Sequence, residues 1–171
     1  MNYPADVFFD IEILLNTAQP SSILLLGDLP ADFLNDYLEQ KALLNQDCTV
    51  TRISSREFNA IDQINQRFDL GIAIDLFEHL DKSSGAQILG KLRDLLTKQF
   101  CICLPISSTD DQRDWQLTDL FGYALKRVAG YQHNGVEYGL FKYNINDYKK
   151  TPDWLNSDNW ANPQMWGKYW W

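Results

Sequence analysis

The sequence predicts an α/β domain built on a mostly parallel sheet, with helices on both faces and an antiparallel hairpin at the C-terminal end. Two observations predict this class. Short apolar runs typical of strands alternate along the chain with segments whose apolar residues recur at helical spacing. The alternation then ends in two consecutive strand-like stretches that flank Asn134-Gly135, and Asn-Gly between two strand patterns is a strong hairpin signal.

The predicted elements follow one another without an internal repeat. In chain order they are a helix over 6–17 with Asp6 as N-cap, a strand over 23–26, a helix from Pro30 to about 45, a strand over 49–53, a short helix over 57–66, a strand over 70–75, a helix over 83–97 capped by Ser83 or Ser84, a strand over 100–104, a helix over about 114–125, and hairpin strands over 126–132 and 136–144. Residues 23–26 and 70–74 are continuous apolar runs, which are typical of strands buried on both faces of a sheet.

Length and composition limit the function classes. The chain has 171 residues, which suits one domain, placed at 1–147, followed by a tryptophan-rich tail at 148–171. Its formal net charge of -8 repels a phosphate backbone, so we expect no nucleic-acid binding. Three cysteines without regular spacing and two histidines predict neither a disulfide framework nor a metal site. Without a basic leader or a long apolar run, the chain is expected to be cytoplasmic and free of membrane contact.

The segment from Phe68 to Leu80, FDLGIAIDLFEHL, carries the most specific signal. A strand ends there in Asp75, and a Leu-Phe-Glu-His segment opens the next loop. Together with the element order and the closing hairpin, this segment resembles the fourth-strand motif of the class I S-adenosylmethionine-dependent methyltransferases, whose fold is Rossmann-like. The resemblance covers roughly residues 6–144 and is strongest around 68–105.

The resemblance implies a site at the carboxyl ends of the strands, where open α/β sheets bind ligands. The positions implied to contact S-adenosylmethionine are Gly27, Asp28, Leu29, Ser54, Asp75 and Leu76. Asp75, Glu78 and His79 are candidates for acid-base catalysis, because an imidazole or a carboxyl group can transfer protons near neutral pH. Two alternatives stay open: Asp75 is equally a turn or helix-capping acid, and the matching Glu-His pair of the family is often structural.

The loop after the first strand departs from the family's pattern. Active relatives carry an acid in the strand and glycines at alternate loop positions, which let the backbone pass close to the cofactor. Here only Gly27 matches, since Leu25 replaces the acid and Leu29 and Ala31 replace glycines. A Leu29 side chain is expected to occupy the space of the methionine moiety. S-adenosylmethionine is therefore a possible but doubtful ligand of this chain.

The second strand and the following helix start also depart from the pattern. Ser54-Ser55-Arg56 offers no acid to hold ribose hydroxyls, and the short connection to residue 68 implies that a strand-helix unit of larger relatives is reduced to one short helix. Asp28 and Asp32 place two negative charges at a helix N-terminus that would otherwise attract anions. These charges repel a pyrophosphate, so NAD is not expected to bind.

Five of the six tryptophans lie in the last 18 residues: Trp154, Trp160, Trp166, Trp170 and Trp171. A buried tryptophan removes about 150–250 Å² from water, so the tail is expected to cover its own domain or to dock onto a protein partner or a second copy. Three functions remain open. The one we prefer is a non-catalytic, methyltransferase-like protein that binds a partner or small molecule. The other two are an active methyltransferase with an atypical cofactor loop and a structural subunit.

Overall fold

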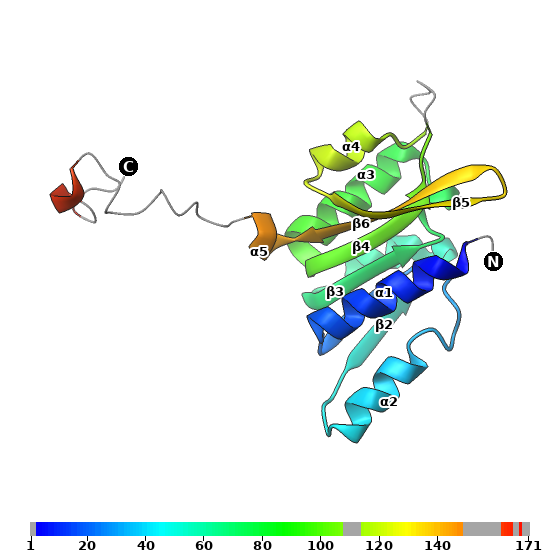
Figure 1. The fold of residues 1–171 in the computed structure, drawn as a ribbon, viewed down its shortest axis with the longest axis horizontal. Helices are drawn as coiled ribbons and strands as arrows, with labels where there is room; N and C mark the ends of the chain where they lie inside the picture. The colour runs from blue at the N-terminus through cyan, green and yellow to red at the C-terminus, as the bar shows by residue number, and fades with distance from the viewer. Residues whose placement is uncertain (1–2, 108–113, 149–161, 166–167, 169–171) are drawn as a thin grey trace.

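The computed structural model describes residues 3–107, 114–148, 162–165 and 168. Within these residues, six strands form one sheet in the order β2-β1-β3-β4-β6-β5 (Figure 1). The strands are β1 (Ser22–Leu26), β2 (Thr49–Ile53), β3 (Phe68–Ile74), β4 (Thr97–Pro105), β5 (Lys126–His133) and β6 (Val136–Asn144). Strands β1 to β4 pair in parallel, whereas β6 pairs antiparallel with both β4 and β5. The predicted fold class and the closing hairpin are confirmed.

Helices cover both faces of this sheet (Figure 1). The described helices are α1 (Ala5–Ala18), α2 (Asn35–Leu43), the 3₁₀ segments η1 (Ser55–Gln63) and η2 (Phe77–His79), α3 (Lys82–Lys91), the π-helical turn η3 (Leu92–Leu96), α4 (Leu117–Gly122), α5 (Ile145–Tyr148) and the short 3₁₀ turn η5 (Pro163–Met165). None of the helices in the described part of the chain is long and apolar enough to span a membrane. Most of the predicted tail, 148–171, lies outside the described residues.

The core consists of two apolar layers, because alternate residues of each strand point to opposite faces. Ile23 and Leu25 of β1 pack with α1 and α2, while Leu24 and Leu26 pack on the other face with α3 and α4. All four are at most 2% exposed, as the continuous apolar run predicts. Cys101 and Cys103 of β4 are buried in the α1 and α2 layer, and all three cysteines are free thiols.

Three helix starts differ from the prediction. Pro4 rather than Asp6 is the N-cap of α1, and Asp6 lies in the first turn. Helix α2 begins at Asn35 instead of Pro30, because Arg52 binds carbonyl groups of residues 30–31 and holds this stretch outside the helix. The cap of α3 is Asp81, whose carboxylate accepts a hydrogen bond from the Ser84 amide.

Two further segments are shorter or differently wound than predicted. The helix expected over 83–97 ends in the turn η3, after which β4 begins at Thr97, whose hydroxyl donates to the Leu92 carbonyl at 2.7 Å. Helix α4 spans only Leu117–Gly122, because a capping box between Gln116 and Asp119 begins it. The expected short helix after β2 is the 3₁₀ segment η1, and it is the only helical segment in the connection between β2 and β3, residues 54–67, all of which the structure describes.

Candidate functional site

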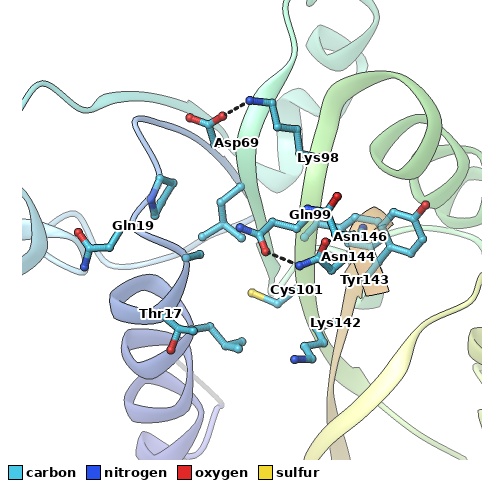
Figure 2. A pocket seen from close by; sticks show the side chains of 15 residues that line it. Thr17, Gln19, Asp69, Lys98, Gln99, Cys101, Lys142, Tyr143, Asn144 and Asn146 are labelled. Atoms are coloured by element: carbon cyan, nitrogen blue, oxygen red, sulfur yellow. Dashed lines mark hydrogen bonds and ion pairs between the residues drawn. The ribbon is translucent and has the colours of Figure 1, made fainter. Parts of the chain in front are cut away.

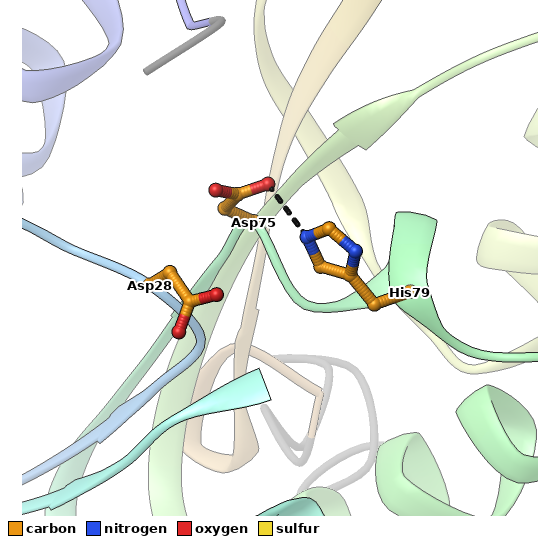
Figure 3. Close-up of side chains that lie close together, drawn as sticks. All are labelled: Asp28, Asp75 and His79. Carbon is orange, nitrogen blue, oxygen red and sulfur yellow. Dashed lines mark hydrogen bonds and ion pairs between the residues drawn. The ribbon is translucent and has the colours of Figure 1, made fainter. Parts of the chain in front are cut away.

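The candidate site lies at the carboxyl ends of β1, β2 and β3. Strands β1 and β3 are adjacent and parallel, with Leu26 opposite Ala73, so the residues that follow them leave the sheet side by side. Asp28 comes from the loop after β1, Asp75 directly follows β3, and His79 comes from η2. Figure 3 shows these three side chains converging, and each offers an oxygen or nitrogen atom within 4.8 Å of those of the other two. We call residues 27–31, 52–55 and 75–79 the strand-end site.

Gly27 is the residue that brings the ends of β1 and β3 into contact. Its φ of 98° is a backbone conformation that favours glycine, and a Cβ atom at this position would lie 1.9 Å from the Ile74 carbonyl oxygen. Its amide also donates to the Ile53 carbonyl at 2.9 Å, which extends the pairing of β1 with β2. The one glycine that matches the family pattern is therefore required by contacts within the chain itself.

Asp28 joins the ends of β1 and β2. Its carboxylate accepts a hydrogen bond from the Ser55 amide at 3.1 Å and another from the Ser55 hydroxyl at 2.6 Å. The Ser55 hydroxyl lowers the pKa of Asp28, so the carboxylate is ionised at neutral pH. Ser54, the position that the resemblance implies, instead donates from its hydroxyl to the Glu57 carboxylate at 3.3 Å. The role of Ser55 depends on a contact between residues 27 positions apart, which no local pattern indicates.

The remainder of the loop after β1 is fastened to β2 as well. The Arg52 guanidinium donates to the Pro30 carbonyl at 3.1 Å and to the Ala31 carbonyl at 2.9 Å. Leu29 is half-buried and packs against the apolar layer that contains α1 and α2. Its expected place in the space of a methionine moiety stays a prediction. The two positions where glycines are usual thus belong to a loop whose carbonyl groups are bound by a neighbouring strand.

Asp75 and His79 form an exposed pair one helical turn apart. Asp75 has a φ of 54°, the left-handed conformation that aspartate tolerates better than most residues. This turn directs the chain into η2, and His79 Nε2 lies 3.1 Å from Asp75 Oδ1. Leu76, which was predicted to contact a cofactor, is 1% exposed and packs in the core layer beside α3. Its side chain is therefore unavailable to a ligand at the surface.

Glu78 points toward the N-terminal segment rather than toward His79. Although the residue as a whole is exposed, its carboxyl group meets the hydroxyl of Tyr3, and Tyr3 is buried. Burial of this carboxyl end raises the pKa of Glu78 to about 7. Tyr3 was not among the predicted site residues, since only the tertiary fold brings it beside a residue 75 positions away.

Two hollows border different ends of the sheet. One of about 570 Å³ lies beyond β4 and is lined by residues that include Phe77, Glu78, Ser107, Trp115 and Glu137. The other, of about 500 Å³, is lined by polar side chains that include Lys98, Gln99, Lys142 and Asn144 (Figure 2). The second hollow lies at the amino ends of β3 and β4, so it is separate from the strand-end site.

The approach of Asp28, Asp75 and His79 does not require an ion. Asp28 accepts two hydrogen bonds from Ser55, and Asp75 is paired with His79, so each side chain has a partner within the protein. Acidic groups also gather on exposed surfaces without binding metal. We therefore assign no metal ligands here, and the expectation that the chain lacks a metal site stays a prediction.

The packing role of Gly27 predicts a large loss of stability in Gly27→Ala. The new methyl group would collide with the Ile74 carbonyl, and the backbone would also hold alanine at a φ that is unfavourable for it. Gly135→Ala is the matched control, because Gly135 has a φ of 79° but no atom within 4 Å of an added Cβ. Urea denaturation should give a loss of roughly 1–2 kcal/mol for the control and at least about 2 kcal/mol more for Gly27→Ala. Equal losses would refute the contact.

Comparisons with solved structures agree on the fold. The chain is similar to TehB from Haemophilus influenzae, with 11% identity, a TM-score of 0.50, and coverage of 78% of this chain and 60% of that one. It is also similar to the pyocyanin biosynthetic protein PhzM, with 10% identity, a TM-score of 0.50, and coverage of 79% and 53%. Magnesium protoporphyrin IX methyltransferase (ChlM) from Synechocystis PCC 6803 with bound SAH is 8% identical to the chain, with a TM-score of 0.49 and coverage of 80% of this chain and 81% of that one. The chain thus spans about 60% of the length of TehB.

No curated protein matches the chain. A family model described as "Family of unknown function (DUF6231)" matches residues 6–171. The structural neighbours are class I S-adenosylmethionine-dependent methyltransferases, and the strand order and the Asp75 motif at the end of β3 accord with that fold. The chain belongs to the DUF6231 family, and its fold is that of the class I S-adenosylmethionine-dependent methyltransferases.

Proposed function

We propose that this chain binds a small molecule or a protein partner on a methyltransferase fold and does not transfer methyl groups. The contact between Asp28 and Ser55 carries the proposal. It places a carboxylate, an amide and a hydroxyl across the ends of β1 and β2, where the resemblance implies that the cofactor's ribose is held. A ligand using the Ser55 amide or hydroxyl as a donor would have to displace Asp28, and Ser55 is only 7% exposed.

The clamp of Arg52 on the loop supports the same conclusion. Glycines at the second and third positions of the family pattern would let the backbone pass close to a cofactor. In this chain the carbonyl groups of Pro30 and Ala31 instead accept hydrogen bonds from Arg52. The loop is therefore anchored by β2, and its stability does not depend on a bound cofactor.

The charges of the strand-end site indicate which small molecules it would accept. Asp28 and Asp75 lie close together, and the Ser55 hydroxyl keeps Asp28 ionised by lowering its pKa. Their negative charges disfavour phosphate-bearing ligands such as NAD at these strand ends. A ligand with a positively charged group is favoured instead.

Active methyl transfer is the second candidate function. The hollow of about 570 Å³ beyond β4 includes Glu78, whose pKa is raised to about 7, and it adjoins the pair of Asp75 and His79. A carboxyl group with a pKa near neutrality is suited to act as a general base. This observation favours an enzyme. It concerns only the hollow beyond β4, however, and does not explain why Arg52 anchors the loop in which a cofactor would bind.

Titration with S-adenosylmethionine distinguishes these two functions. We expect no saturable heat in calorimetry and no change in melting temperature at about 1 mM ligand, because the groups of the cofactor loop are already bonded within the chain. A ligand with a Kd of about 10 μM would stabilise the fold at that concentration by about 2.7 kcal/mol, which raises a melting temperature by several degrees. The same samples should release no S-adenosylhomocysteine.

The matched variant for this titration is Asp75→Asn. Asparagine also tolerates a left-handed backbone, so the turn after β3 is retained while one charge is removed. Saturable binding in the wild-type chain that Asp75→Asn weakens at least tenfold would contradict the closed cofactor site, and release of S-adenosylhomocysteine from the same samples would establish methyl transfer.

The tryptophan-rich tail provides the second part of the proposed function. Its five tryptophans lie outside the described residues, which in the tail are 162–165 and 168. They are the chain's richest source of interface anchors. We expect deletion of residues 152–171 to lower either the stability or the oligomeric state of the chain, because apolar surface loses its partner. Urea denaturation and size-exclusion chromatography measure the two effects. An equally stable truncated chain with an unchanged elution volume would contradict a docking role for the tail.

A further inference from the structure

Tyr3 lies against the carboxyl ends of the paired strands β3 and β4. Its ring packs against Tyr138 of β6, with the ring centroids 4.9 Å apart, and the residue is 7% exposed. The Asp75 amide donates to the Tyr3 hydroxyl at 3.3 Å, and the hydroxyl lies 3.3 Å from the Cys103 carbonyl oxygen. The segment before α1 therefore fills a position at which sheets of this class bind ligands.

The hydrogen bonds of the Tyr3 hydroxyl are fully satisfied only when Glu78 is protonated. A tyrosine hydroxyl has one proton to donate and two lone pairs that accept. The Cys103 carbonyl and an ionised Glu78 would compete for that single proton, and one buried acceptor would remain unpaired. A protonated Glu78 donates its own proton to the hydroxyl oxygen, so the hydroxyl proton is free to bond the Cys103 carbonyl.

Among the residues that the structure describes, the groups facing Glu78 include one that can carry a positive charge. The titratable groups that face it are Tyr3 from the N-terminal segment, Asp75 and His79 from the loop after β3, Cys103 from β4, and Tyr138 from β6. Of these, only His79 can carry a positive charge, and it is already paired with Asp75. Burial of the carboxyl end accordingly raises the pKa of Glu78 from 4.5 to about 7.

We propose that Tyr3 is a pH-gated plug, which covers the carboxyl ends of β3 and β4 while Glu78 is protonated and leaves them when Glu78 ionises. Burial raises the pKa of Glu78 in the docked state, so its contribution to docking is complete below pH 4.5 and is lost as the pH rises to about 7. Within that interval the docking equilibrium falls by up to about tenfold per pH unit. Above it the plug is at its weakest, and the amide of Asp75 and the carbonyl of Cys103 become available to a ligand.

Amide hydrogen exchange of the full-length chain tests the plug without any ligand. The Asp75 amide donates to Tyr3, so its exchange rate, measured by NMR and divided by the intrinsic rate at each pH, reports docking directly. Between pH 5 and pH 8 we expect its protection to fall by at least about tenfold. The Leu89 amide in the core of α3 is the internal reference and should keep a constant protection factor.

Three variants separate the plug from other causes of pH dependence. Glu78→Gln cannot ionise and still donates to the Tyr3 hydroxyl, so the Asp75 amide should stay protected at every pH. Tyr3→Phe keeps the ring against Tyr138 but lacks the hydroxyl, so protection should be low throughout. His79→Gln should retain the transition, although imidazoles change charge in the same pH range.

Several results would overturn the plug. These are a wild-type protection factor at Asp75 that does not change between pH 5 and pH 8, a transition that persists in Glu78→Gln, and a transition that disappears in His79→Gln. Each of them is measured without a ligand, so the plug and the proposed binding function can fail separately.

Discussion

The contact between Gly27 and the Ile74 carbonyl is the constraint on which the strand-end site depends. It brings the ends of β1 and β3 so close that no side chain fits between them. Asp28 and Asp75 therefore leave the sheet side by side, and Ser55 and Tyr3 approach them from β2 and from the N-terminal segment. Because packing alone requires this glycine, its presence is no sign of cofactor binding, although it matches a position of the cofactor loop.

Polar groups at the strand ends are bound within the chain in three places. Ser55 bonds Asp28, Arg52 bonds the carbonyl groups of the loop at residues 30–31, and Tyr3 bonds the Asp75 amide. In a methyltransferase that binds its cofactor here, the same groups would be expected to face that cofactor. Their internal pairing accounts for the loss of loop glycines without loss of the fold, because a loop anchored by Arg52 has no need of close backbone contact with a cofactor.

Local patterns predicted the sheet well and the site only in part. The apolar runs ending in Leu26 and Ile74, and the turn at Asn134-Gly135, are fixed by neighbouring residues, and these elements are confirmed. The placement of Asp28 and Asp75 together follows from parallel strand pairing. Ser55 and Tyr3 could not be foreseen, because their partners are 27 and 72 or more positions away and a hydrogen bond over that distance leaves no periodic signal.

The amide of Ser55 gives the most direct measurement of whether the strand-end site is complete without a cofactor. It donates to Asp28, so its hydrogen exchange in the ligand-free chain reports the bond that joins β1 and β2. We expect protection close to that of the β2 amides, unchanged by about 1 mM S-adenosylmethionine or by S-adenosylhomocysteine. Rapid exchange of this amide in the free chain, with protection that rises at least tenfold when either compound is added, would contradict this expectation.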